Sequence, residues 1–149
     1  MKAEKKKSTS QRLVQIRHSG TFREVLDSHD AADEPSFCQY LYKLMEERNL
    51  SAKDMISGSG IHRSYFYAVL AGQKTPAKNI ILRFVLVLHC TLNETNRLLR
   101  LAGLSDLYAL RRRDAVLIYA VEHKASIQET NEMLEEAGEE PLYRQETKE

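Results

Sequence analysis

Apolar residues recur three or four positions apart over most of this 149-residue chain, the spacing that places side chains on one face of an α-helix. The clearest such stretch begins at Ser36, a residue type that suits a helix N-terminus, and continues through Phe37, Leu41, Leu44 and Met45. No stretch of any length alternates apolar and polar residues as a half-buried strand does. The pattern therefore predicts an all-α fold.

Four more helices are expected after this one, because start and stop signals punctuate the apolar pattern. Ser51 with Asp54, and Thr91 with Glu94, have the spacing of a capping box, and Gly72 suits the left-handed residue that follows a helix. The five expected helices are 36–49, a short one from 51 that ends at the turn 58–60, 62–71, 77–89 and 91–103. Short links between them favour one packed helical domain over residues 36–104.

The first 35 residues are expected to form a separate region. Residues 1–20 are basic and are predicted to be a flexible arm. A short helix is predicted over 21–28, because Thr21 and Glu24 have capping-box spacing ahead of a small apolar side. An acidic turn, 30–34, then leads to Pro35.

An internal repeat with a period of 35 residues covers the end of the chain. The segment TLNETNRLLRLAGLSDLY (91–108) returns as SIQETNEMLEEAGEEPLY (126–143), and an apolar helix precedes each copy, at 80–88 and 115–121. The repeating unit is therefore a helical hairpin, and two hairpins can stack. We expect residues 105–149 to be a second hairpin with an acidic tail, which extends the core of the five-helix domain and offers a surface to a protein partner.

The net charge of +1 hides an uneven distribution. The net charge is +5 over residues 1–20, −4 over 21–54, +7 over 55–113 and −7 over 114–149. No Asp or Glu occurs between Met55 and Asn93. A positive middle segment could bind phosphates, or the oppositely charged segments could be solvated separately or pair with each other.

Composition and motifs argue against several classes of protein. The longest apolar run, 80–88, contains Arg83 and is too short to span a bilayer, and no apolar stretch of a secretory signal follows the basic start. Cys38 and Cys90 are isolated, which favours buried thiols of a reducing compartment. The histidines are scattered, and no catalytic or phosphate-loop motif occurs. We therefore expect a cytoplasmic, non-enzymatic protein with no membrane association, cofactor or metal.

One stretch carries a more specific signal. Its positions are Leu50-Ser51, Met55-Ile56, Gly60-Ile61, His62-Arg63-Ser64, Phe66, Val69, Gly72-Gln73-Lys74 and Pro76. Residues 50–76 thereby resemble the XRE/Cro-type (lambda-repressor-like) helix-turn-helix family, and the likeness extends more loosely from Ser36 to Gly103. The resemblance implies a five-helix repressor-type domain whose recognition helix, about His62–Ala71, lies in the major groove of double-stranded DNA.

The resemblance also implies which residues contact DNA. Arg63, Ser64 and Ala68 fall at the base-reading positions, where Arg63 would grip a guanine and Ala68 would touch a thymine methyl group. Residues expected at phosphates or flanking the bases are Lys53, His62, Tyr65, Tyr67, Gln73, Lys74 and Lys78. The basic run 111–113 is instead interpreted as a solvated helix start.

The stretch departs from the family pattern at three positions. Ala52 replaces a phosphate-binding Gln, Ile56 replaces a small Ala, and Leu70 replaces a Glu. The first change weakens the phosphate clamp, and the other two make the helix pair more apolar. The sequence thus predicts a sequence-specific DNA-binding transcriptional regulator that acts as a homodimer. The alternative is a helical adaptor that keeps this fold and binds protein.

Overall fold

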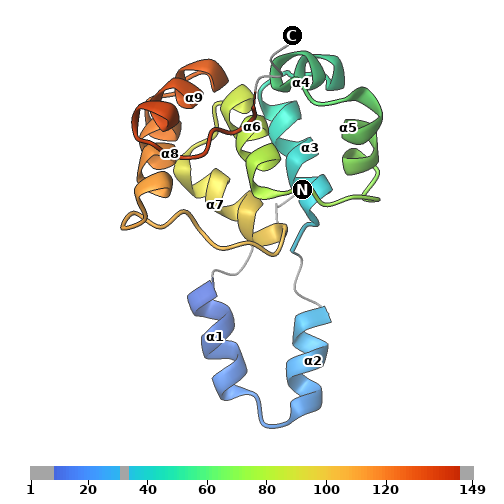
Figure 1. The fold of residues 1–149 in the computed structure, drawn as a ribbon. Coiled ribbons are helices and arrows are strands. Elements are labelled where there is room, and N and C mark those ends of the chain that lie inside the picture. The colour runs from blue at the N-terminus through green and yellow to red at the C-terminus, as the bar shows by residue number, and fades with distance from the viewer. Residues whose placement is uncertain (1–8, 31–33, 145–149) are drawn as a thin grey trace. The chain divides into compact units, whose positions relative to one another are not determined.

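The computed structural model describes residues 9–30 and 34–144, and within these ranges it contains nine α-helices and no strand (Figure 1). The predicted all-α class is confirmed. The chain divides into two compact units, Met1–Pro35 and Ser36–Glu149. In the part of the chain described, no helix has the length and apolar character needed to cross a membrane.

The described residues of the first unit form two helices, α1 (Thr9–His18) and α2 (Phe22–Asp30). The flexible arm predicted for residues 1–20 is therefore wrong over α1, where ten residues without Gly or Pro form a regular helix. Residues 1–8 and most of the predicted acidic turn lie outside the described residues. The helix expected from residue 21 is confirmed, since the Glu24 N–H donates to Thr21 Oγ1 at 3.1 Å.

The second unit contains seven helices in an order close to the predicted one. They are α3 (Phe37–Glu47), α4 (Ala52–Ser59), α5 (Arg63–Leu70), α6 (Lys78–Leu88), α7 (Leu92–Leu101), α8 (Arg112–Glu122) and α9 (Ile127–Glu136). Ser51 and Thr91 form the predicted capping boxes with Asp54 and Glu94. The helix end expected within residues 58–60 lies at Gly60, because α4 continues through Gly58 and, of the two glycines, only Gly60 is left-handed.

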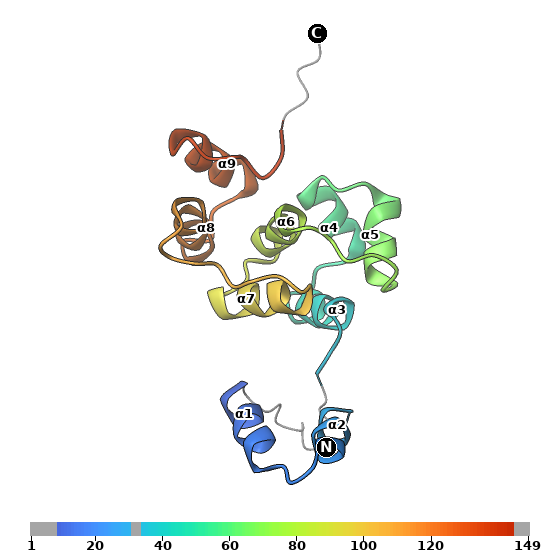
Figure 2. The same cartoon turned by 60° about the horizontal axis from the view of Figure 1, so that its bottom comes forward.

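A single hydrophobic core fills the second unit. Helix α6 packs against α4, α7 and α9, while α3 packs against α5 and α7 (Figures 1 and 2). The largest fully buried side chains come from all seven helices: Leu41, Leu44, Met55, Phe66, Ile81, Leu82, Phe84, Leu88, Leu98, Leu99, Leu117 and Leu134. Residues on both sides of position 104 share this core, so the second hairpin widens it.

The two copies of the repeat make the same internal hydrogen bonds. Asn96 Oδ1 accepts the Leu107 N–H at 2.9 Å, and Asn131 Oδ1 accepts the Leu142 N–H at 2.8 Å. These bonds tie the segment that follows each hairpin back to the hairpin's second helix. The identity of the two copies therefore reflects a shared set of polar anchors as well as shared apolar positions.

The two hairpins also contact each other reciprocally. Helix α6 packs on α9, and its repeat counterpart α8 packs on α7, the counterpart of α9. At the helix starts, Lys78 Nζ donates to Asp114 Oδ1 at 2.7 Å, and Arg113 Nη2 donates to Asn79 Oδ1 at 2.7 Å. Residues 78 and 113, like 79 and 114, are 35 positions apart. The hairpins are thus related by an approximate two-fold axis.

Three helix junctions share one geometry. Asn49, His89 and Lys124 are left-handed, with φ of 54°, 52° and 52°, and each precedes an apolar residue and a capping Ser or Thr. In each junction the apolar residue's N–H bonds to a carbonyl five positions back, as in Leu50 to Met45 at 2.9 Å. The sequence pattern missed the second and third of these turns, because they contain neither Gly nor Asn, the residues that most often end a helix in this conformation.

Candidate nucleic-acid interface

The helix α4 is fixed at its start by two side chains. Ser51 Oγ accepts the Asp54 N–H at 3.1 Å, and the Asp54 carboxylate accepts the Ser51 N–H at 2.8 Å. The hydrogen bond from the Ser51 N–H, followed by the one from its hydroxyl, lowers the pKa of Asp54 below its usual value. Lys53 is exposed in the same first turn.

The turn from α4 to α5 contains only residues 60–62. Gly60 is left-handed there, with φ of 69°, and a Cβ at this position would lie 3.1 Å from Arg83 Nη2. Arg83, from α6, donates through Nε to the Ser59 carbonyl at 2.9 Å. Both the backbone conformation and this close approach therefore favour glycine, and Arg83 fixes the angle at which α5 leaves the turn.

Arg83 is a positioning residue that the sequence analysis did not single out. Its guanidinium also lies over the Tyr143 ring, 4.9 Å from the centroid, and partial burial lowers its pKa. The available signal was an arginine inside the apolar run 80–88, since a charged group in such a run needs a partner. The partner is a backbone carbonyl, which a sequence pattern does not identify.

The first turn of α5 is exposed and carries two of the three predicted base-reading residues. Arg63 and Ser64 are both exposed. His62 is the N-cap, and its Nδ1 accepts the Ser64 N–H at 3.3 Å and lies 2.7 Å from Ser64 Oγ. The Arg63 guanidinium lies over the Tyr67 ring, 5.5 Å from its centroid, which is an attractive cation–π distance.

The opposite face of α5 anchors it in the core. Phe66 and Val69 are fully buried, and the Phe66 ring meets Phe84 of α6 edge-on at 5.4 Å between centroids. The helical period then turns Arg63 and Tyr67 outward. Ala68, the third predicted base-reading residue, is only half-buried and so retains some accessible surface.

The loop after α5 carries two of the predicted flanking residues, Gln73 and Lys74. Gly72 is left-handed, with φ of 77°, and Gln73 and Lys74 that follow it are exposed. Lys74 Nζ lies 5.3 Å from the centroid of the half-buried Tyr65 ring. Arg63, Gln73 and Lys74 thus belong to α5 and the loop that directly follows it.

Lys78 differs from the other predicted flanking residues because its ammonium group already has a partner. It forms an ion pair with Asp114, whose side chain is 3% exposed and also accepts the Tyr108 N–H at 2.9 Å. Burial raises the pKa of Asp114, but the hydrogen bonds from Lys78 and Tyr108 outweigh burial and hold the pKa below its usual value. This geometry gives Lys78 a structural role between the hairpins.

The structure also shows how far the other residues discussed in the sequence analysis are buried. Ala52, Ile56 and Leu70, the departures from the family pattern, are half-buried and pack against the core. Arg113 is not a purely solvated residue, since it bonds to Asn79 and to the Glu140 carbonyl. Cys90 is buried as expected, and burial raises the pKa of its thiol to about 12, but Cys38 is only half-buried.

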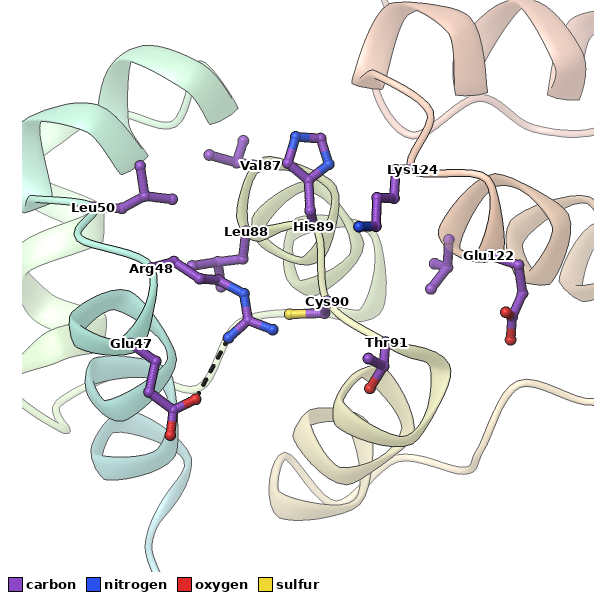
Figure 3. Close-up of a pocket in the computed structure, with 11 residues that line it drawn as sticks. Glu47, Arg48, Leu50, Val87, Leu88, His89, Cys90, Thr91, Glu122 and Lys124 are labelled. Carbon is purple, nitrogen blue, oxygen red and sulfur yellow. Dashed lines mark ion pairs between the residues drawn. The ribbon is translucent and has the colours of Figure 1, made fainter.

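A separate groove of about 840 Å³ opens between the helix junctions (Figure 3). Its lining mixes both charges: Arg48 pairs with Glu47 and with Glu94, and Lys124 and Glu122 lie on the opposite wall (Figure 3). Among the described residues, no three His, Cys, Asp or Glu side chains gather as metal ligands would. The exposed face of α5 remains the better candidate for a functional site.

The segment of the chain that contains α5 carries charges of one sign. Arg63, Lys74 and the partly buried Arg83 occur in the segment 55–93, which contains no acidic residue. Comparison of the chain with protein-family models, with curated proteins and with solved structures gave no match.

Proposed function

We propose that this chain is a sequence-specific DNA-binding transcriptional regulator of the repressor-type helix-turn-helix class. The observation that carries the proposal is the exposed first turn of α5, where Arg63 and Ser64 project from a segment that lacks acidic residues from 55 to 93. The resemblance of residues 50–76 to the XRE/Cro-type family supports the same assignment. In this proposal α5 enters the major groove of double-stranded DNA.

Each exposed residue of α5 has a defined role in the proposed complex. Arg63 donates two hydrogen bonds to a guanine, after its guanidinium leaves or slides along the Tyr67 ring. Ser64 contacts a neighbouring base, and the accessible part of Ala68 meets a thymine methyl group. His62 acts indirectly, because as N-cap it holds the first turn of α5 in a helical conformation.

The phosphate contacts come from residues beside the helix. Lys53 at the start of α4 and Gln73 and Lys74 after α5 are exposed and available to phosphates. The hydroxyls of Tyr65 and Tyr67 are further candidate donors. We assign Lys78 a structural role instead of a phosphate contact, because Asp114 neutralises its charge.

The test is selection of bound sequences from a random double-stranded DNA library at near-physiological salt. We expect an enriched motif, and we expect Arg63→Ala to weaken binding to that motif by about 1–3 kcal/mol, the effect of one lost bidentate base contact. The matched control is Arg100→Ala, which removes one exposed positive charge from α7, where Arg100 is paired with Asp106 of the following loop. Equal losses in the two variants would show that Arg63 contributes only charge.

Salt dependence separates phosphate contacts from base contacts. Lys74→Ala should reduce the slope of log affinity against log salt by about 1, while affecting all DNA sequences alike. Lys78→Ala should leave that slope unchanged and lower thermal stability, because it removes an internal ion pair. A random library with no enriched motif would contradict the proposal.

A helical adaptor that binds protein is the second candidate. It is favoured by the segment between α7 and α8, where Leu110 is 82% exposed and Tyr108 is 52% exposed. Aromatic and large apolar side chains of this kind are enriched at protein interfaces. Binding through such a surface would persist as salt rises, whereas phosphate-dependent binding would weaken steeply. Titrating salt against the binding signal therefore distinguishes the two functions.

A further inference from the structure

The first unit exposes an unusual amount of apolar surface for its size. Its helices α1 and α2 contain only 10 and 9 residues. Among the side chains described between Ser10 and Leu26, none is buried. Five large apolar side chains are exposed: Leu13, Val14, Ile16, Phe22 and Leu26. This hairpin therefore presents apolar residues on both helices without a core of its own.

A polar contact joins the two helices, and apolar side chains project away from it. Arg12 of α1 donates to the Val25 carbonyl of α2 at 3.1 Å, and it also donates to Gln15 Oε1 within α1 at 3.1 Å. With 100° per residue, Leu13 and Val14 project away from the side of α1 that carries Gln15. Phe22, at the start of α2, is 77% exposed. Within the hairpin itself, this apolar face is thus left uncovered.

A hairpin of this size is expected to be stable only when its apolar face is covered. Helices of about ten residues are marginal in water on their own, because nucleation is costly and few hydrogen bonds repay it. Units of this size usually gain stability from oligomerisation or another added interaction. Burying an apolar face of this kind supplies that stability at roughly 25 cal/mol per Å².

The charges of the two helices favour a second copy of the hairpin as the partner that covers this face. Helix α1 carries Arg12 and Arg17 and no acidic residue, whereas α2 carries Arg23 against Glu24, Asp27 and Asp30. The net charges are therefore +2 and −2. Another copy of the hairpin complements both helices at once if each α1 lies beside the other copy's α2. Pairing of like helices would instead bring equal charges together.

We propose that the α1–α2 hairpin is a homodimerisation element, which forms a four-helix bundle with the same hairpin of a second copy. Leu13, Ile16, Phe22 and Leu26 supply its core, Val14 lies at the edge of that core, and α1 of each copy pairs with α2 of the other. The interface is isologous, so every substitution affects it twice. This proposal does not depend on DNA binding, and its tests contain no DNA.

The first test is the mass of the full chain in solution, measured by sedimentation equilibrium over a concentration series. The unsubstituted chain should have twice the monomer mass of 17.1 kDa. Leu13→Asn with Leu26→Asn should yield monomers, with dimerisation weakened at least about a hundredfold, since each leucine is lost from both copies. A chain that stays monomeric at every concentration would overturn the proposal, because its hairpin then packs within one copy.

Charge exchange tests the pairing of α1 with α2. Arg17→Glu makes both helices less complementary in one chain, and Asp27→Lys with Asp30→Lys does the same in another. Each variant alone should dimerise more weakly than the unsubstituted chain. An equimolar mixture should recover dimers, because the mixed dimer restores one α1–α2 pair of opposite charge and contains no α1–α2 pair of equal charge. Failure of the mixture to recover would contradict this pairing.

Two controls separate the hairpin from other exposed surfaces. Tyr42→Ser on α3 and Tyr119→Ser on α8 each remove an exposed aromatic ring from the second unit, where Tyr42 and Tyr119 have exposures of 55% and 53%. Both variants should remain dimeric. The thermal unfolding of every variant is recorded alongside, and the second unit should melt as in the unsubstituted chain. Monomers from Tyr119→Ser, with dimers from the leucine variant, would overturn the proposal and place the interface on α8.

Discussion

The hairpins α6–α7 and α8–α9 share a skeleton but differ in surface charge. Both have a left-handed junction residue, a capping box and an Asn that holds the following segment. At equivalent positions, however, Arg97 and Arg100 of α7 correspond to Glu132 and Glu135 of α9. The comparison teaches that a few buried and capping positions maintain this hairpin, while the outward charges can be inverted.

The surroundings of the two copies explain which charges can change. Arg97 of α7 lies over the Tyr40 ring of α3, 4.7 Å from its centroid, and Glu94 pairs with Arg48. Helix α9 packs only against α8 and α6 among its stronger contacts, and its corresponding Glu132 is exposed. The first hairpin is therefore an internal part of the unit, and the second forms one of its margins.

The largest expected effect comes from a buried leucine that both copies share. Leu99→Ala and Leu134→Ala should each lower the free energy of unfolding by about 2–5 kcal/mol, through lost apolar burial and a residual cavity. Leu99 should lie at the upper end, because α7 packs against three helices. Urea titration followed by circular dichroism measures both. A greater loss at Leu134 would contradict the marginal position of α9.

The link between the hairpins should be next in size and should depend on pH. Asp114→Asn should lower the free energy of unfolding by about 1.5–3 kcal/mol at pH 7, because it removes a charged hydrogen bond to Lys78. The folded-state pKa of Asp114 is lowered, so its contribution is present above the unfolded value of about 3.9 and is lost as the pH falls through the folded value. The difference between the urea midpoints of the two proteins should therefore shrink as the pH falls below about 3.9. A difference that stays constant below that pH would contradict this reading of Asp114.

The shared asparagines test whether the two copies use the same anchor. Asn96→Ala and Asn131→Ala each leave a backbone N–H without its partner, which should lower the free energy of unfolding by about 1–3 kcal/mol. Asn131 should have the larger effect, because its hydrogen bond is buried. The matched control is Asn93→Ala on the exposed side of α7, which should be nearly neutral. Similar losses at Asn93 and Asn96 would contradict the anchor role of Asn96, because Ala has the higher helix propensity and does not by itself destabilise α7.

The smallest expected effect concerns a position where the copies differ, Cys90 against Ala125. Burial raises the pKa of the Cys90 thiol to about 12, so it is protonated and unreactive near pH 8. Iodoacetamide followed by mass spectrometry should label the half-buried Cys38 first, and Cys90 only after unfolding. Equal labelling of both thiols in the folded protein would show that the junction opens readily.

The sequence predicted helix starts better than turns and long-range contacts. Ser36, Ser51 and Thr91 cap their helices as expected, because a cap and its partner lie three residues apart. The left-handed turns at His89 and Lys124 were missed, since neither residue type marks such a turn. Helix α1 was also missed, because the basic start of the chain was interpreted as a flexible arm.

The candidate site shows the same division between local and distant information. The exposure of Arg63 and Ser64 follows from the helical period around the buried Phe66. Lys78 donates to Asp114, which is 36 positions away, and Arg83 donates to the Ser59 carbonyl, which is 24 positions away. Neither partner could be identified from spacing, so one predicted phosphate contact was assigned to a residue that the fold already uses.

The reciprocal contact between the hairpins limits how this fold could grow. Each hairpin meets the other through the same surface, so forming the contact occupies that surface in both copies. Head-to-tail stacking would leave a free end for each new unit, as in open arrays. A third 35-residue duplication added to this chain would find no vacant docking surface of this kind, and the pair of hairpins is therefore a closed arrangement.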